Sequence, residues 1–305
     1  MAEYITIKGY TLQNRTSDPL TEGAAGASWS SGGDVNTARN SSRGMGTVNT
    51  AMIAAGGYDG SNAQVITESY NGRAWTEVGD MNTAKSQGAA SGQSPYQNSI
   101  MFGGGPALAV AEIWNGSSWT EVGDLNTGRR ELAGAGTSST NALAMGGQNN
   151  TDNLAVTESW NGSSWTEVGD LNAGRGATHG AGTTTSALAS GGYTTAYVGV
   201  NESYNGTSWT EVADLNTSRG YASQTAGSNN TSALVVGGTP DTANTEVWNG
   251  TAWTELNNMP AVRVNAAGAG TTASALIAGG RNPNLTNTSL EWNDPVLSTK
   301  TADVD

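Results

Sequence analysis

The sequence contains no cysteine, one histidine (His179) and one phenylalanine (Phe102) among its 305 residues. Without cysteine, disulfide bonds and thiolate metal sites are excluded. With a single histidine, catalytic pairs that depend on an imidazole base have at most one place to form. The sequence therefore argues against the common histidine- and cysteine-based enzyme chemistries, and we expect neither a cofactor nor a metal.

Basic residues and long apolar runs are also scarce. Thirteen Lys and Arg residues stand against 26 Asp and Glu residues, which gives a net charge of -13. Such a charge repels nucleic-acid phosphates and anionic lipids, so we expect no nucleic-acid partner. No window approaches the roughly 18 apolar residues of a membrane helix, and the first residues lack the pattern of a secretory signal. We therefore expect no membrane insertion.

Tryptophan and glycine, by contrast, are abundant, and their positions repeat. Six tryptophans recur 44 to 46 residues apart: Trp29, Trp75, Trp119, Trp165, Trp209 and Trp253. Five are preceded by a Glu-x-Tyr/Trp-Asn-Gly stretch, and an altered sixth stretch, 291–294, ends the series. Each unit also carries a diglycine after a short apolar run. A fixed period of this length is typical of a repeat architecture.

Each unit divides into four strand-length segments bounded by Gly and Asn, without any helical periodicity. Six units of four antiparallel strands predict an all-β fold, a six-bladed β-propeller. Asn71-Gly72 read as a two-residue hairpin loop predicts that Tyr70 faces Arg73 and that Glu68 faces Trp75. Since the chain begins with a lone outer strand around Trp29 and ends with three strands, we expect its two ends to pair and close the ring.

Recurrence between units separates scaffold from site. The tryptophans and the aromatic residues of the third segments recur, which predicts packing between blades. One glutamate and one basic residue also recur in each unit, which predicts a partly buried ion pair or a backbone clamp, because an unpaired buried carboxylate is costly. The paired series are Glu68, Glu112, Glu158, Glu202, Glu246 and Glu291 with Arg39, Lys85, Arg129, Arg175, Arg219 and Arg263.

The diglycine, the aromatic residue of the third strand, the tryptophan of the fourth and the basic residue ten positions later resemble the kelch repeat over residues 21–293. The period is shorter than the roughly 50 residues of kelch, and the loop before the tryptophan is reduced to Asn-Gly. The Gly/Thr/Asn-rich style and the stretch "IKGYTLQNRTSDPLTEG" look like kelch-like virion proteins of tailed phages of marine bacteria. That resemblance implies a virion protein located on a tail or capsid surface.

The units differ most between the diglycine and the glutamate of the third strand, where seven to ten residues intervene. These connections are predicted to share one face with the links between blades, and that face is the candidate binding surface. Aromatic rings beside amides and carboxylates suit sugar recognition. The candidate residues are Tyr58, Asp59, Asn149, Asn150, Asp152, Tyr193, Tyr197, Arg281 and Asn282. His179 falls where other units carry small residues and is expected to line the axial channel.

The sequence thus predicts a non-enzymatic phage virion protein, displayed in multiple copies, that recognises a host-surface glycan or protein. Residues 1–20 are predicted to be an arm that attaches to other virion proteins, 21–293 the propeller, and 294–305 a C-terminal tail. Two alternatives remain open: a cellular kelch-type adaptor that binds a protein, and a polysaccharide-active enzyme that uses carboxylates.

Overall fold

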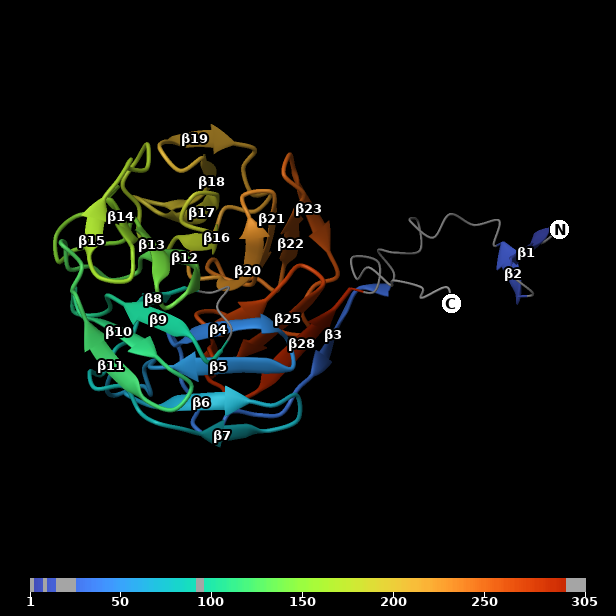
Figure 1. The fold of residues 1–305 in the computed structure, drawn as a ribbon, viewed down its shortest axis with the longest axis horizontal. Helices are drawn as coiled ribbons and strands as arrows, with labels where there is room; N and C mark the ends of the chain where they lie inside the picture. Colours follow the sequence, from blue (N-terminus) through green and yellow to red (C-terminus); the bar gives the residue numbers. More distant parts are fainter. Residues whose placement is uncertain (1–2, 8–9, 15–25, 92–95, 295–305) are drawn as a thin grey trace.

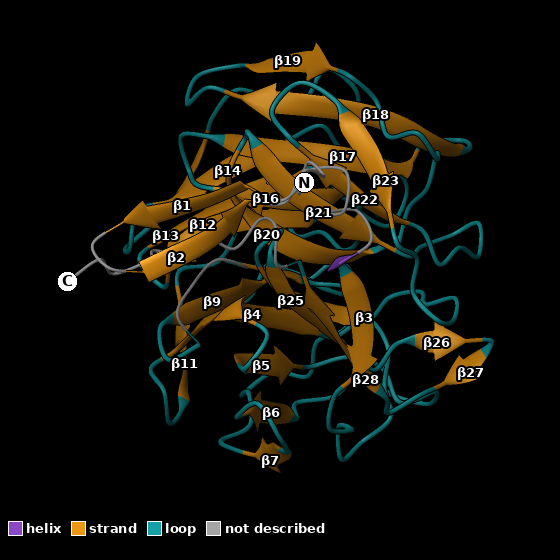
Figure 2. Cartoon of the chain, turned by 90° about the vertical axis from the view of Figure 1, so that its right-hand side faces the viewer, coloured by secondary structure: helices purple, strands orange, loops and turns teal. Residues whose placement is uncertain are grey.

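The computed structural model describes residues 3–7, 10–14, 26–91 and 96–294. Six four-stranded antiparallel sheets surround a central axis (Figure 1), which confirms the predicted six-bladed propeller. Figure 2 views the ring from its edge, with the small ribbon β26–β27 standing out from the blades.

We number the blades in chain order, each from its innermost strand outward. Blade 1 comprises β4 (Arg43–Val48), β5 (Ala51–Ala55), β6 (Thr67–Tyr70) and β7 (Trp75–Glu77). Blade 2 comprises β8 (Ala89–Ala90), β9 (Ser99–Phe102), β10 (Ala111–Trp114) and β11 (Trp119–Val122). Blade 3 comprises β12 (Ala133–Ser138), β13 (Asn141–Met145), β14 (Thr157–Trp160) and β15 (Trp165–Glu167). Blades 4 and 5 comprise β16 (His179–Gly182), β17 (Ala187–Tyr193), β18 (Tyr197–Tyr204) and β19 (Trp209–Val212); and β20 (Ser223–Asn229), β21 (Ser232–Val236), β22 (Thr245–Trp248) and β23 (Trp253–Leu256).

Blade 6 closes the ring with strands from both ends of the chain. It comprises β24 (Ala267–Gly270), β25 (Ser274–Ala278), β28 (Ser289–Asn293) and β3 (Ser28–Ser31), and the ribbon of β26 (Arg281–Asn282) and β27 (Asn284–Leu285) interrupts it between β25 and β28. In the register of β28 and β3, Trp292 lies opposite Trp29, with ring centroids 5.3 Å apart. The predicted pairing of the two chain ends is confirmed (Figure 1).

The core lies between blades rather than within them. Trp119 of blade 2 packs in one buried cluster with Met45 and Ile53 of blade 1, and its indole N–H donates to Thr67 Oγ1 of blade 1 at 2.9 Å. The innermost strands approach so closely that a Cβ atom added at Gly134 would lie 2.4 Å from the carbonyl oxygen of Ala90. The recurring tryptophans therefore hold neighbouring blades together, and the small residues near the axis allow the inner strands to converge.

The predicted register of the Asn-Gly hairpin is wrong. Tyr70 lies opposite Trp75, and Glu68 lies opposite Glu77, so the loop has four residues, 71–74, rather than two. The Asn71 carboxamide oxygen accepts the backbone N–H groups of Arg73 and Ala74, each at 3.0 Å. This side-chain turn replaces the predicted type I′ turn, and only Gly72 takes a positive φ, of 88°.

The proposed domain limits remain predictions. Within the predicted arm, β1 (Glu3–Ile7) and β2 (Tyr10–Asn14) pair as an antiparallel hairpin, with Ile5 opposite Leu12. The rest of residues 1–20 and, apart from Asp294, the predicted tail 294–305 lie outside the described residues.

Candidate functional site

The link entering each blade and the connection between its second and third strands lie on one face of the ring. Asn40 of a link forms a β-bridge with Tyr58 of a connection, and Arg130 and Val264 pair in the same way with Gln148 and Arg281. The prediction that links and connections share a face is therefore confirmed. We call this face, formed by the links and the second-to-third-strand connections, the variable face.

The recurring charged residues beneath the variable face bind one another and the backbone inside the protein. In blade 3, Arg129 Nη1 donates to Glu158 Oε1 at 2.6 Å, and Glu158 Oε2 accepts the backbone N–H of Asn126 at 2.7 Å. Arg129 Nη2 also donates to the carbonyl of Ala144 at 3.1 Å. The predicted ion pair forms in five blades: Arg39–Glu68, Lys85–Glu112, Arg129–Glu158, Arg175–Glu202 and Arg219–Glu246.

The sixth predicted pair, Arg263 with Glu291, is not among the ion pairs of the described residues. Pro260 occupies the position that asparagine holds in the other links, and proline has neither a backbone N–H nor an amide to offer the carboxylate. Glu291 instead accepts the hydroxyl of Tyr70 at 2.6 Å, while Arg263 Nη1 donates to the carbonyl of Gly279 at 3.0 Å. The blade that closes the ring thus replaces the ion pair by a hydrogen bond to blade 1.

Burial of the ion pair between Lys85 and Glu112 shifts the pKa values of both groups. Burial lowers the pKa of Lys85 below its ordinary value, although the hydrogen bond and charge of Glu112 oppose that shift. For Glu112, burial alone would raise the pKa, but the hydrogen bond and charge of Lys85, with donors from Asn82, bring it below the ordinary value. Each group is the other's counterion, which favours the charged form of both and opposes the effect of burial.

Four of the nine predicted site residues line one pocket of about 230 Å³ on the variable face. Asn149, Asn150 and Asp152 come from the connection of blade 3, and Tyr193 is the last residue of β17, where the connection of blade 4 begins. A hydrogen bond of 2.9 Å from Asn153 Nδ2 to the carbonyl of Thr194 joins the two connections. We call this feature, lined by residues 148–153, Arg130, Tyr193 and Thr194, the blade 3–4 pocket.

The shape of the blade 3–4 pocket is fixed by its own loop. Asn149 Oδ1 accepts the backbone N–H groups of Thr151 and Asp152 at 2.8 and 2.7 Å. The hydroxyl of Thr151 lies 2.6 Å from Asp152 Oδ2. These bonds hold the amide and carboxylate groups in place, so Asn149 acts chiefly as a turn residue within the pocket.

A cluster of tyrosines continues from this pocket toward the axis. Tyr193 and Tyr197 face each other across the β17–β18 hairpin, with ring centroids 5.2 Å apart, and Tyr197 lies 6.5 Å from Tyr221 of the next blade. Burial raises the pKa of Tyr197 above its ordinary value, as does the neighbouring Tyr193. The three rings therefore form a partly buried aromatic wall.

The other predicted residues lie elsewhere on the ring. Tyr58 and Asp59 belong to blade 1, and Arg281 and Asn282 form β26 of blade 6. Asp59 Oδ1 accepts the backbone N–H groups of Ser61 and Asn62, each at 2.8 Å, and these bonds lower its pKa. A Cβ atom added at Gly60 would lie 3.5 Å from Leu285 Cδ1, so this connection adjoins the β26–β27 ribbon. Asp59 therefore shapes its own turn, in a second cluster of candidates.

Sequence reasoning missed a ring of residues at the mouth of the axial channel. In every blade, the residue two positions after the basic residue has a left-handed backbone, with φ between 52° and 59°: Ser41, Gln87, Glu131, Ala177, Tyr221 and Asn265. Non-glycine residues adopt this conformation rarely, and such outliers cluster at functional sites. The sequence carried one signal for these residues, because all six units differ at this position although the basic residue two positions earlier is almost constant.

Backbone hydrogen bonds join this ring around the axis. In five places a residue donates its N–H to the carbonyl of its equivalent in the preceding blade: Tyr221 to Ala177, Asn265 to Tyr221, Ser41 to Asn265, Gln87 to Ser41, and Glu131 to Gln87, at 2.7 to 3.2 Å. Since the main chain makes these bonds, the side chains are free to differ. We call these six residues the mouth ring.

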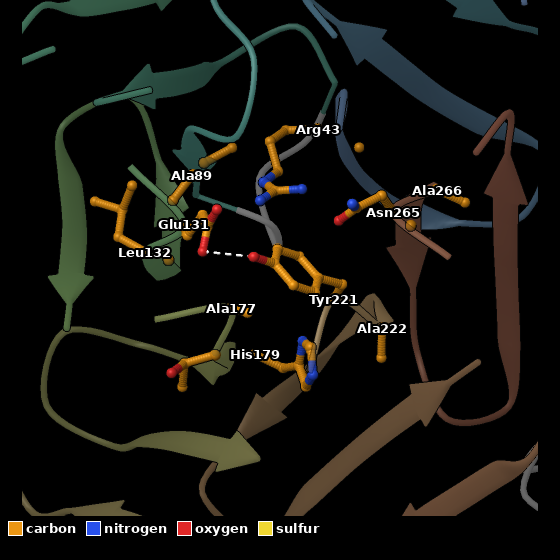
Figure 3. A pocket seen from close by; sticks show the side chains of 15 residues that line it. Arg43, Ala89, Glu131, Leu132, Ala177, His179, Tyr221, Ala222, Asn265 and Ala266 are labelled. Carbon is orange, nitrogen blue, oxygen red and sulfur yellow. Dashed lines mark hydrogen bonds between the residues drawn. The ribbon is translucent and has the colours of Figure 1, made fainter. Parts of the chain in front are cut away.

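Below the mouth ring lies a cavity of about 50 Å³, lined by residues of all six blades. Arg43, Glu131 and Tyr221 converge there (Figure 3), and His179 lines the cavity from blade 4. The expectation that His179 lines the channel is confirmed. Glu131 accepts the Tyr221 hydroxyl at 2.8 Å and Gln87 Nε2 at 3.1 Å.

Comparison with protein-family models gives no match for this chain, and a search of curated proteins gives no significant similarity. Within the described residues no helix is long and apolar enough to cross a membrane. The same residues contain no group of three or more His, Cys, Asp or Glu side chains arranged to hold a metal ion.

Proposed function

We propose that the chain is a non-enzymatic, kelch-like virion protein that recognises a host-surface glycan through its variable face. The observation that carries this proposal is the blade 3–4 pocket. Polar groups from the divergent connections of two blades converge there beside the ring of Tyr193. The charges that recur between blades, by contrast, are paired with each other in the interior of the protein. Divergent residues gathered at one place are what a single recognition site in a repeat protein requires.

The chemistry of the blade 3–4 pocket suits a sugar better than an apolar ligand. An aromatic ring offers its face to the C–H groups of a pyranose, while amides and carboxylates hydrogen-bond to its hydroxyls. Arg130 also lines this pocket and adds a cationic donor. A few fixed polar groups around a concave surface are typical of small-ligand sites.

The attachment role is proposed for residues 1–20, which include the β1–β2 hairpin. An isolated two-stranded hairpin is marginal in water, so pairing or packing with another virion protein would stabilise it. Several copies per particle would raise the avidity of weak glycan binding.

The proposal is tested with the full chain on a glycan array, beside mass spectrometry of purified particles. We expect binding to a restricted set of glycans, loss of binding in Tyr193→Ala, and retention of binding in the matched variant Tyr58→Ala on blade 1. Recovery of the chain from particles would support the virion assignment. Binding to peptides instead of glycans, or absence of the chain from particles, would contradict the corresponding half of the proposal.

A further inference from the structure

The axial cavity has a feature that the scaffold does not explain. Four positions after the basic residue of each link, blades 2, 3, 5 and 6 carry Ala89, Ala133, Ser223 and Ala267. Blades 1 and 4 carry Arg43 and His179 instead, and both residues line the cavity. Blades 1 and 4 are opposite one another in a ring of six, so these two large polar residues approach the axis from opposite sides.

Arg43 has no carboxylate partner within salt-bridge distance among the described residues. Its Nε donates to the carbonyl of Gly88, and its Nη1 donates to the carbonyl of Ser42 at 3.3 Å. Burial lowers the pKa of Arg43 to about 10, and the charge of Glu131 only partly opposes this shift. The guanidinium is thus charged at neutral pH and only partly compensated.

His179 is the second unusual group. Its side chain is only 4% exposed, and Nε2 is buried without a hydrogen-bond partner among the described atoms. Burial, and then the charges of Arg219, Arg43 and Arg175, lower its pKa to about 3, so the imidazole is neutral at pH 7. A neutral imidazole whose Nε2 carries the proton can donate one hydrogen bond there.

Glu131 is already engaged by its neighbours in the mouth ring. Its two carboxylate oxygens accept from Gln87 and from Tyr221, whose side chain reaches from blade 5 to blade 3 across the mouth (Figure 3). The pair of Tyr221 and Glu131 forms a bar over the cavity. Arg43 and His179 line the same cavity with a guanidinium that lacks a carboxylate partner and an imidazole Nε2 that lacks a hydrogen-bond partner among the described residues.

We propose that the axial cavity is a binding site for a small carboxylate, held by the guanidinium of Arg43 and by Nε2–H of His179. A guanidinium presents a planar fork that matches a carboxylate, and an anion supplies the charge that Arg43 lacks. A volume of about 50 Å³ holds a group of a few heavy atoms, not a whole sugar ring. This site is separate from the blade 3–4 pocket and does not depend on glycan recognition there.

The test uses the fact that His179 is the only histidine of the chain. The full protein is labelled with ¹⁵N-histidine, and the imidazole signals are followed at pH 7 during addition of sodium acetate. Acetamide serves as the neutral analogue and sodium chloride as the ionic control. We expect a saturable shift of the His179 signals with acetate only, together with a higher melting temperature in acetate than in chloride at equal ionic strength.

Two variants locate the site. Arg43→Gln should abolish the acetate shift, whereas Arg73→Gln, the same change at an exposed loop residue of the opposite face, should leave it intact. If Arg43→Gln does not fold, the comparison of acetate with acetamide in the unaltered protein decides the matter. Equal shifts with acetate, acetamide and chloride, no saturable shift with acetate, or an unchanged shift in folded Arg43→Gln would overturn the proposal.

Discussion

The buried ion pairs make a strong prediction for stability, and Glu158→Gln tests it. Glu158 is fully buried, and its two oxygens accept from Arg129 at 2.6 Å and from the backbone of Asn126 at 2.7 Å. A glutamine has one acceptor and one donor group, so its NH₂ must face either the guanidinium or a backbone N–H. Breaking a buried pair in this way costs about 3–5 kcal/mol, because one charge stays buried without its counterion.

Two other variants calibrate this value. Glu167→Gln changes the exposed residue directly opposite Glu158 on β15, and its effect should stay within about 0.5 kcal/mol. Glu291→Gln keeps an acceptor for the Tyr70 hydroxyl and has no ion pair to lose, so we expect a cost of about 1 kcal/mol. The free energy of unfolding is measured by urea titration at pH 7, with two spectroscopic probes to check for a two-state transition. A cost for Glu158→Gln no larger than that for Glu291→Gln would refute the reasoning.

Three further predictions concern the channel, the inner strands and the turns. The pKa of His179 is lower in the folded protein than in the unfolded chain, so its contribution to the free energy of unfolding should be complete above pH 6.5. As the pH drops toward 3, the free energy of unfolding should fall by up to about 1.4 kcal/mol per pH unit. His179→Gln should remove this pH-dependent loss from urea titrations across that range. Gly134→Ala should cost at least 1–3 kcal/mol in thermal melts, because its Cβ would collide with the carbonyl of Ala90 at 2.4 Å, whereas Gly123→Ala, with its nearest atom at 3.3 Å, should cost less. Asn71→Ala should cost about 1 kcal/mol, measured by urea unfolding, because two backbone N–H groups lose their acceptor.

Recurrence explains how much of the fold the sequence predicted. The spacing of the tryptophans gave the number of blades, and the interrupted repeat at the two chain ends gave the pairing of β3 with β28. The paired glutamate and basic series predicted an ion pair or backbone clamp in each of the six units, because a charge that recurs in every unit needs a recurring partner. Five of these ion pairs form.

The errors and omissions arose where one side chain decides the local structure. An Asn-Gly sequence is compatible with a two-residue turn, but the carboxamide of Asn71 closes a four-residue loop instead. The sixth ion pair failed because Pro260 removes the donors that hold the glutamate in the other blades. Neither competition can be settled from spacing alone.

The candidate site was predictable in part. Divergent connections gave the variable face, and four of the nine residues proposed there line the blade 3–4 pocket. The mouth ring was missed because its shared property is a left-handed backbone φ angle, which the residue types at these positions do not predict. The six side chains at that position share no chemistry; what they share is a left-handed φ and a place at the axis.

Closure of the ring by pairing of β3 with β28 can be tested with an engineered disulfide. Ser28 of β3 lies opposite Asn293 of β28, and the chain has no other cysteine to confuse the result. On mild oxidation, the double variant Ser28→Cys/Asn293→Cys should form an intramolecular disulfide, seen by mass spectrometry as the loss of two hydrogens in a cross-linked peptide from the two chain ends. The matched pair Ser28→Cys/Ser163→Cys, with its second cysteine in blade 3, should remain reduced or form intermolecular dimers. Free thiols in the first variant under conditions that oxidise accessible pairs, or equal cross-linking in both variants, would contradict the closed six-bladed ring.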